Sequence, residues 1–216
     1  MPTATWERLP EARRRAVLDA AETEFAARGF SGGSLNTIVR EAGIAKGSLF
    51  QYFEDKADLY AHLAELASVR IRARMEEHIE GLDWEADFFG ALGSTMRFWT
   101  EYFARHPVDR AMTAAVNLEP EESTRTAVRV KVNRHYVEVL APLVAAAGAN
   151  GSLRPGADLD AFLALLMLIL PHLAIAPHHA GLDPVLGLFE GDEGERRATV
   201  ARLNDVFELA FGPLPS

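Results

Sequence analysis

Apolar residues recur at intervals of three and four along almost the whole of this 216-residue chain. That spacing aligns apolar side chains on one face of an α-helix, whereas a half-buried strand alternates apolar and polar residues. No segment alternates in this way between Gly/Asn turn pairs. The pattern therefore predicts an all-α fold, and the length together with 49% hydrophobic residues allows one or two buried cores.

The composition excludes several classes of protein. The chain has no cysteine, which rules out disulfides, thiolate nucleophiles and cysteine-ligated zinc, and suits a reducing cytosol. The N-terminal stretch "MPTATWERLPEARRR" lacks the apolar core of a signal peptide. With 22 Lys+Arg against 31 Asp+Glu, the formal net charge is -9, so the protein is not generally basic. We expect a soluble cytoplasmic protein.

The most apolar segment, "AFLALLMLIL", covers residues 161–170 between Asp160 and Pro171. A membrane-spanning helix needs about 20 residues, so this segment is too short to be one. Proline removes a backbone donor and clashes with the preceding turn, so Pro171 is expected to kink or end the helix. No membrane partner is predicted.

Glycine, proline and capping residues divide the chain into helices. In the first 80 residues they predict helices over about 10–29, 34–42, 46–53 and 56–80. The fourth of these can begin with Asp55 as its cap, with Asp58 three residues later as in a capping box. Farther along, the predicted helices cover about 83–106, a shorter segment to 118, then 123–147, one opened by Asp158, and 195–211.

The short helix predicted over 46–53 has two different sides. At about 100° per residue the apolar side chains face away from the small and polar ones, with Leu49, Phe50 and Phe53 opposite Gly47, Ser48 and Gln51. So short a helix is not stable alone, so Leu49 and Phe53 should anchor it in a core. The outer side is then free to contact a partner, and Gly47 lets the backbone approach that partner closely.

Together with residues 34–42 and the turn "GIA", this helix makes a helix-turn-helix pattern. The stretch "AAETEFAARGFSGGSLNTIVREAGIAKGSLFQYFEDKADL", residues 20–59, resembles the N-terminal DNA-binding domain of TetR-family transcriptional repressors. The resemblance covers nearly all of the first 60 residues. It is carried, in order and with family spacing, by Ala20-Ala21, Phe25, Gly29-Phe30, Ile38, Ala42-Gly43-Ile44, Gly47, Leu49, Tyr52-Phe53, Lys56 and Leu59.

This resemblance implies two domains. An N-terminal three-helix helix-turn-helix DNA-binding domain is expected over residues 1–57, and a C-terminal helical effector-binding and dimerisation domain over residues 58–216. It also implies a homodimeric repressor that releases a palindromic operator in double-stranded DNA when a small-molecule effector binds. Neither a cofactor nor an enzymatic activity is implied.

Carried over residue by residue, the family's phosphate and base contacts fall on Ser34, Asn36, Lys46, Gly47, Ser48, Gln51, Tyr52 and Lys56. Gln51 is assigned base reading because its amide can pair with N6 and N7 of adenine in the major groove. Phe50 replaces the family's usual tyrosine, so a phosphate-contacting hydroxyl is absent and Phe50 is expected only to pack. Ala45 replaces a frequent serine, so this helix should lack a side-chain N-cap.

Charge argues for few phosphate contacts. Residues 1–60 contain 8 Lys+Arg and 9 Asp+Glu, and the reading segment has Lys46 and Lys56 but no acid before Glu54. The affinity of a DNA-binding protein falls with salt in proportion to the phosphates that it neutralises. We therefore expect a modest salt dependence.

The C-terminal helices carry a set of mostly apolar residues that we expect to contact the effector: Phe89, Met96, Trp99, Phe103, Met112, Asn117, Tyr136, Phe162 and Leu166. The helices that carry them resemble those that enclose the effector cavity in this family. A large apolar cavity suits a hydrophobic ligand, which Asn117 and Tyr136 could orient. Plain core packing remains the alternative for each residue.

The last two helices are expected to form the dimer interface. The segment "AFLALLMLIL" is apolar on all sides, so its own domain and a second subunit are both expected to cover it. The final helix adds an apolar stripe of Val200, Leu203, Phe207 and Ala210. This arrangement resembles the four-helix dimer interface of the family. No metal site is predicted, because His172, His178 and His179 have no Cys or carboxylate at ligand spacing.

Two other classes of function stay open. A dimeric helical ligand-binding protein with weak or lost DNA binding is suggested by Phe50 and the acidic N-terminal domain. An all-α enzyme is the least favoured class, because the sequence offers no nucleophile with a base, no paired carboxylates and no metal-ligand set.

Overall fold

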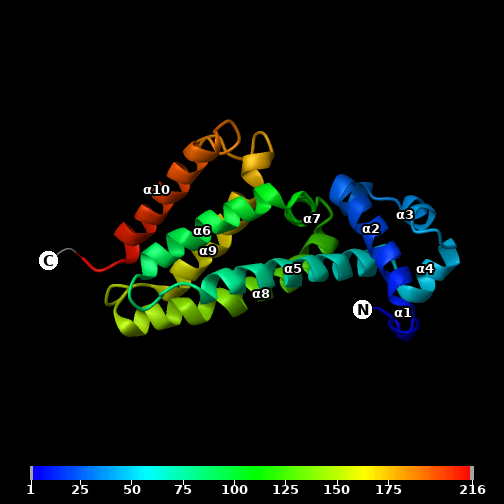
Figure 1. Cartoon of the computed structure of the whole chain (residues 1–216), viewed down its shortest axis with the longest axis horizontal. Helices are drawn as coiled ribbons and strands as arrows, with labels where there is room; N and C mark the ends of the chain where they lie inside the picture. Colours follow the sequence, from blue (N-terminus) through cyan, green and yellow to red (C-terminus); the bar gives the residue numbers. More distant parts are fainter. Residues whose placement is uncertain (1, 215–216) are drawn as a thin grey trace. The chain divides into compact units, whose positions relative to one another are not determined.

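The computed structural model describes residues 2–214, and within that range it is built from helices without a strand. This confirms the predicted all-α class (Figure 1). The elements are α1 (Ala4–Glu7), α2 (Glu11–Gly32), α3 (Leu35–Glu41), α4 (Lys46–Tyr52), α5 (Lys56–Glu80), α6 (Phe88–Arg105), α7 (Pro107–Asn117), α8 (Glu122–Asn150), α9 (Leu159–Ile175), the 3-10 helix η1 (Ala176–His178) and α10 (Glu193–Phe211).

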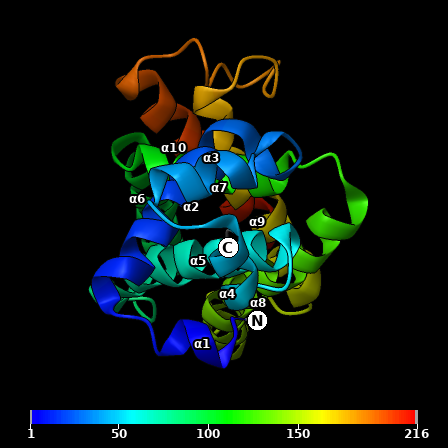
Figure 2. The ribbon, with the colours of Figure 1, turned by 90° about the vertical axis from the view of Figure 1, so that its right-hand side faces the viewer.

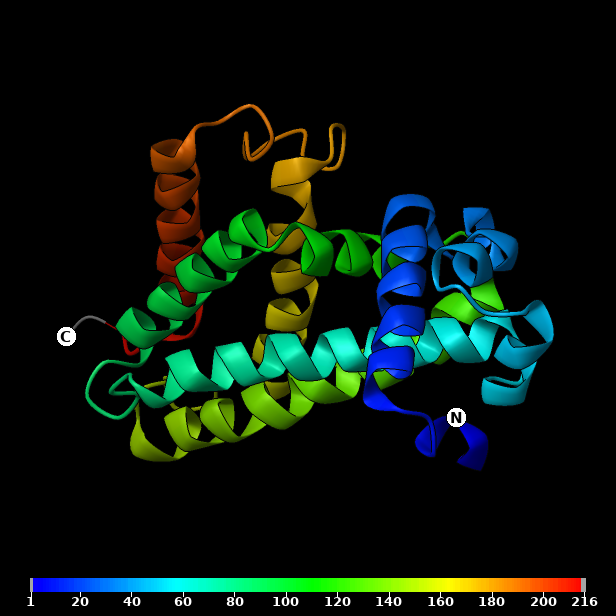
Figure 3. The same ribbon diagram turned by 45° about the vertical axis from the view of Figure 1, so that its right-hand side comes forward.

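The chain divides into two compact units. The first unit is Met1–Arg70 with Pro107–Val132, and the second unit is Ile71–His106 with Asn133–Ser216. Helices α5 and α8 therefore each contribute to both units. The predicted domains, 1–57 and 58–216, separate expected DNA binding from expected effector binding, and their boundary stays a prediction. The first packing unit, however, includes α7 as well as the first 57 residues, because α7 contacts α2 (Figure 3).

The first unit packs α2, α3 and α4 against the start of α5, with α1 beside α4 (Figure 2). Its most deeply buried side chains are Val17, Phe25, Ile38, Leu49, Phe53, Leu59, Tyr60 and Met112. Leu49 and Phe53 anchor α4 as predicted, being 2% and 1% exposed. Burial in this shared core is what allows a seven-residue helix to persist.

The helix ends in this unit follow the predicted capping residues. The Ser34 hydroxyl accepts a hydrogen bond from the Thr37 amide at 3.4 Å, and the Asp55 carboxylate accepts one from the Asp58 amide at 2.8 Å. Ala45 provides no side-chain cap for α4, as expected. Gly43 has φ +65°, a left-handed conformation that glycine adopts at low cost, so it ends α3. The short helix α1 was not predicted.

In the second unit, α6 contacts both α9 and α10 (Figure 1). The Asp158 carboxylate accepts from the Ala161 amide at 2.9 Å and begins α9, as predicted. Asp192 and Glu195 form a capping box that begins α10. These polar ends fix where each apolar helix enters the unit.

Pro171 does not end its helix. Helix α9 continues to Ile175, four residues beyond the proline, and η1 follows directly. The resulting 20-residue stretch Leu159–His178 has a mean hydropathy of 2.2 and is long and apolar enough to cross a membrane by length and composition alone. The ten-residue length inferred from the sequence was therefore too short. Buried residues make up 39% of the tested window, and a core helix has the same composition.

Candidate nucleic-acid interface

The outward side of α4 is the candidate interface. Its exposed residues are Lys46, Gly47, Phe50 and Gln51. At about 100° per residue these four positions are contiguous on the helix, while Leu49 and Phe53 point the other way into the core. A Cβ placed on Gly47 would meet nothing within 4 Å, so no neighbour in this unit requires a glycine there. Gly47 instead keeps the backbone of α4 accessible to an external surface.

The expectation that Phe50 only packs is wrong. Its side chain is 46% exposed, which places it on the same side as Lys46 and Gly47 rather than beside Leu49. The physical reason is the helix angle, because residue 50 lies about 100° from residue 49 and about 60° from residue 47. Grouping Phe50 with the core residues took apolar character as a sign of burial. The exposed side of α4 therefore carries a large apolar group at its centre.

The remaining predicted DNA contacts differ in how accessible they are. Asn36 is exposed on α3, and Ser48 and Ser34 are half-buried. Tyr52 is only 5% exposed, so most of this side chain is unavailable to a strand of DNA. Its ring packs on Trp6 with ring centroids 5.8 Å apart.

Lys56 is half-buried at the start of α5. Its Nζ lies 4.6 Å from the centroid of the Phe30 ring. Such a cation–π contact restrains the ammonium near the surface without neutralising it. Phe30 thus fixes where the charge of Lys56 is presented.

The backbone around Phe30 is in turn held by a distant carboxylate. At the end of α2, Gly29 has φ +65°, which breaks the helix at the predicted position. Glu119, between α7 and α8, is 3% exposed and accepts from the Phe30 amide at 3.0 Å and from the Ser31 hydroxyl at 2.6 Å. Glu119 was not predicted, since no local pattern links residues almost 90 positions apart.

The same carboxylate affects a tyrosine of the core. Tyr60 is fully buried, and its hydroxyl has no hydrogen-bond partner within residues 2–214. Burial, and to a lesser extent the charge of Glu119, raise the pKa of Tyr60. Its ring also packs edge-on against Phe25 at 5.1 Å between centroids. Tyr60 therefore stays neutral and serves the packing beneath the α2–α3 turn.

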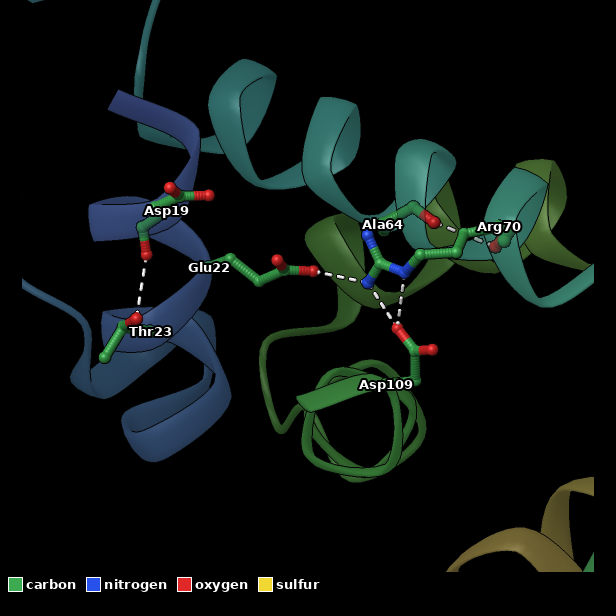
Figure 4. A network of polar contacts seen from close by, with 7 residues as sticks. Asp19, Glu22, Thr23, Ala64, Arg70 and Asp109 are labelled. Atoms are coloured by element: carbon green, nitrogen blue, oxygen red, sulfur yellow. Dashed lines mark hydrogen bonds and ion pairs between the residues drawn. The ribbon is translucent and has the colours of Figure 1, made fainter. Parts of the chain in front are cut away.

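A second polar network joins α2, α5 and α7 within the first unit (Figure 4). The Arg70 guanidinium donates from Nε to Asp109 at 2.9 Å and from a terminal nitrogen to Glu22 at 2.7 Å. Asp109 is 3% exposed, and Arg70 supplies a positive charge beside this buried carboxylate. Glu22 on α2 is thus tied to α5 and α7 by two side chains that lie outside residues 20–59, Arg70 and Asp109.

Comparison with known proteins finds a family match in the N-terminal part of the chain. A sequence profile described as "Bacterial regulatory proteins, tetR family" matches residues 17–63. The HTH-type transcriptional regulator AcrR of Shigella flexneri is 33% identical over 84 residues, which are 39% of this chain and 36% of that protein. The likeness to the TetR family is therefore established for residues 17–63. It covers little more than a third of the length of that relative, so the match concerns part of each protein.

Solved TetR-family structures agree with the fold over nearly the whole chain. A TetR-family transcriptional regulator from Chloroflexus aurantiacus superposes with a TM-score of 0.67, at 24% identity over 99% of this chain and 100% of the other. FadR from Bacillus subtilis, solved in complex with stearoyl-CoA, gives 0.66 at 16% identity over 89% and 96%. At these identities the likeness establishes the fold.

The predicted effector contacts fall in both units. Seven belong to the second unit: Phe89, Met96, Trp99, Phe103, Tyr136, Phe162 and Leu166. Trp99 lies 4.9 Å from Phe103 and 5.6 Å from Tyr136 between ring centroids, and donates from Nε1 to the Leu170 carbonyl at 2.7 Å. The structure thus groups Trp99, Phe103 and Tyr136 as an aromatic cluster.

The other two predicted effector contacts belong to the first unit. Met112 is 1% exposed within its core. The Asn117 side chain donates to the Thr113 carbonyl at 2.8 Å and accepts from Arg129. Both side chains are therefore already engaged within the first unit.

The second unit has a cleft and a groove on its surface. A cleft of about 160 Å³ between α6 and α10 includes Phe89 among its walls. A groove of about 380 Å³ along α9 and α10 is lined almost wholly by apolar side chains: Leu165, Leu168, Ile169, His172, Leu203, Val206, Phe207, Ala210 and Phe211. Within residues 2–214 no group of three or more His, Cys, Asp or Glu side chains is arranged to hold a metal ion.

Proposed function

We propose that this protein is a cytoplasmic transcriptional repressor of the TetR family that binds a palindromic operator as a homodimer and releases it when a small effector binds. The observation that carries the proposal is the exposed side of α4, where Lys46, Gly47 and Gln51 lie together over an anchored core. Such a helix fits the major groove of B-DNA.

The proposed contacts divide by chemistry. Gln51 reads adenine through its amide, and Lys46 and Lys56 contact phosphates. Gly47 and Ser48 let the backbone approach, while Ser34 and Asn36 contact phosphate from α3. Tyr52, being 5% exposed, is given no base contact.

Phe50 takes a different role from the one expected from the sequence. An exposed phenylalanine at the centre of a reading helix can make apolar contact with the 5-methyl group of thymine. We therefore assign thymine recognition to Phe50. A tyrosine at the same place would add a hydroxyl that phosphate or water could bind, so Phe50 makes the contact more purely apolar.

The groove on α9 and α10 supports the proposed homodimer. Leu168 is 72% exposed, Val206 60% and Leu209 80%, which is unusual for large apolar side chains on two adjacent helices. A second copy of this face would bury them. Changing Leu168 and Val206 to glutamate should convert the dimer to monomers in light-scattering measurements while leaving the helical circular dichroism intact. A double variant that remains dimeric would contradict the interface.

The proposed effector has a large apolar part. Trp99, Phe103 and Phe162 form its contact surface, and the stearoyl-CoA bound to FadR, which has the same fold, makes long-chain acyl compounds the first probes. Stearoyl-CoA and stearate should release operator DNA and quench the protein's tryptophan fluorescence. If neither changes operator affinity or fluorescence, acyl effectors are excluded.

The first experiment is selection of duplexes from a random-sequence pool, alongside a gel shift with the DNA upstream of the protein's own gene. The repressor proposal expects a palindromic motif and a modest decrease of affinity with salt, as two lysines per protomer imply. A pool that yields no enriched duplex, from a protein that still dimerises, favours the alternative of a ligand-binding protein that has lost DNA binding.

A further inference from the structure

The N-terminal helix α1 is bound to the end of α4. Thr3, which precedes α1, donates from its hydroxyl to the Gln51 carbonyl at 2.6 Å and from its amide to the Tyr52 carbonyl at 3.0 Å. These bonds join residues 48 and 49 positions apart in the sequence. The segment over Thr3–Arg8 therefore touches the helix that presents Gln51.

These two carbonyls need partners from outside α4. The last carbonyls of a helix have no intrahelical donor, and α4 ends at Tyr52. The Phe53 amide already donates to the Leu49 carbonyl at 3.0 Å, which closes the last turn. Thr3 then satisfies the Gln51 and Tyr52 carbonyls, so it acts as a C-cap supplied from a distant part of the chain.

Thr3 also begins α1, which fixes its own position. Its hydroxyl accepts from the Trp6 amide at 3.4 Å, and its carbonyl accepts from the Trp6 and Glu7 amides at 3.0 and 3.3 Å. One hydroxyl thus accepts from α1 and donates to α4. Valine has the same shape as threonine but can do neither.

Trp6 holds this junction in place by packing. It is 3% exposed, and its ring centroid lies 4.9 Å from that of Phe53, 5.8 Å from that of Tyr52 and 6.2 Å from that of His62 on α5. Burying an indole against neighbouring rings stabilises one arrangement of the helices that carry these rings. Trp6 therefore fixes α1 against both α4 and α5.

We propose that Thr3 and Trp6 are positioning residues of the DNA interface: they hold the last turn of α4 so that Gln51 meets its base in the correct orientation. This inference rests on the proposed function, because it concerns how Gln51 is presented to DNA. Loss of the cap should therefore reduce discrimination between operator and random DNA more than it reduces non-specific binding.

The operator test uses the full chain and three threonine variants. Thr3→Val removes the hydroxyl, Thr3→Ser keeps it, and Thr23→Val is the matched control, since the exposed Thr23 hydroxyl donates to the Asp19 carbonyl at 2.8 Å within α2 (Figure 4). Thr3→Val should weaken operator binding by about three- to tenfold and leave random-duplex binding unchanged. Thr3→Ser and Thr23→Val should stay within about twofold of wild type.

A second readout needs no DNA. Hydrogen exchange of the Tyr52 and Phe53 amides should become several-fold faster in Thr3→Val and remain at the wild-type rate in Thr3→Ser. Unchanged exchange in Thr3→Val, a serine variant that behaves like valine, or equal loss of specific and random binding would each overturn the proposal. Should the wild type select no duplex, the proposed function fails, and the exchange experiment alone upholds or overturns the capping of α4 by Thr3.

Discussion

Buried carboxylates are used differently in the two units. In the first unit, Glu119 bonds to Phe30 and Ser31 at the end of α2, and Asp109 bonds to Arg70 on α5. In the second unit, Asp183 is 8% exposed and accepts from amides of its own loop, those of Val185, Leu186 and Leu188, at 2.7 to 3.1 Å. Long-range carboxylates couple helices, whereas a local one shapes a single loop.

The difference shows that the helix-turn-helix is not set by residues 1–57 alone. The Phe30 amide and the Ser31 hydroxyl at the end of α2 donate to the Glu119 carboxylate. Helix α2 is also tied to α5 and α7 through Arg70. Changes at Asp109 or Glu119 should therefore alter DNA binding although neither residue is near the exposed side of α4. Changes at Asp183 should not.

The largest effect is expected from Glu119→Ala. This change removes the buried acceptor of the half-buried Phe30 amide and of the Ser31 hydroxyl, which should cost about 3 kcal/mol of unfolding free energy. Urea denaturation measures it, with exposed Glu122→Gln as the control. A cost below about 1 kcal/mol would mean that the α2–α3 turn keeps its geometry without this carboxylate.

Asp183→Ala removes the local carboxylate of the second unit. Its hydrogen bonds are local, so we expect a loss of about 1 kcal/mol and faster hydrogen exchange confined to residues 183–188. Faster exchange in α2 or α3 would contradict the distinction between local and long-range carboxylates.

Arg70 and Arg72 lie two residues apart on α5 and pair with carboxylates that differ in burial. Arg70 bonds to Asp109, whose side chain is 4% exposed, whereas Arg72 bonds to Glu76 and Glu138, which are 41% and 46% exposed. Arg70→Met should cost about 2 kcal/mol, after allowance for the arginine's own exposure, and Arg72→Met about 0.5 kcal/mol. Equal losses in thermal or urea unfolding would show that burial of the carboxylate does not decide the effect.

A smaller effect concerns pH. Burial lowers the pKa of His62, although Asp58 and Glu7 act in the opposite direction. Because the folded pKa lies below the unfolded value of about 6.5, the unfolded state binds more protons, and stability falls as the pH decreases from 7 toward the folded pKa. His62→Gln should reduce this loss between pH 7 and pH 5 in urea titrations. An identical pH profile in the variant would show that His62 does not cause this loss of stability.

The smallest effect on stability is expected at Phe50. Phe50→Ala removes an exposed ring, so unfolding should change by less than about 0.5 kcal/mol. Replacing a contacted thymine by uracil, which lacks the methyl group, should weaken wild-type binding about fourfold and leave the alanine variant unaffected. Equal sensitivity of both proteins to uracil would rule out methyl recognition by Phe50.

Local sequence was sufficient for most helix positions. Ser34, Gly43, Asp55 and Asp158 mark helix ends through bonds to residues a few positions away or through a backbone conformation that favours glycine. Helix α1 escaped prediction because four residues give no periodicity. Pro171 was expected to kink or end its helix, and α9 does not end there.

The candidate site was only partly predictable. Helical periodicity placed Gly47, Ser48 and Gln51 on one face, of which Ser48 is half-buried, and the family resemblance supplied the roles of these residues and of Lys46. Phe50 was misplaced because apolar character does not determine burial on a helix with few core positions. The contacts of Thr3 and Glu119 join segments that are 48 and 89 residues apart, which no single-sequence pattern encodes.

The central claim is that the exposed side of α4 reads DNA through Gln51. The most direct measurement is the affinity of wild type and Gln51→Ala for the selected operator, for operators with single base changes, and for random duplex. The account predicts that Gln51→Ala binds the operator about tenfold more weakly, becomes indifferent to one particular base pair, and binds random duplex as wild type does. If Gln51→Ala weakens every sequence equally, Gln51 does not read a base.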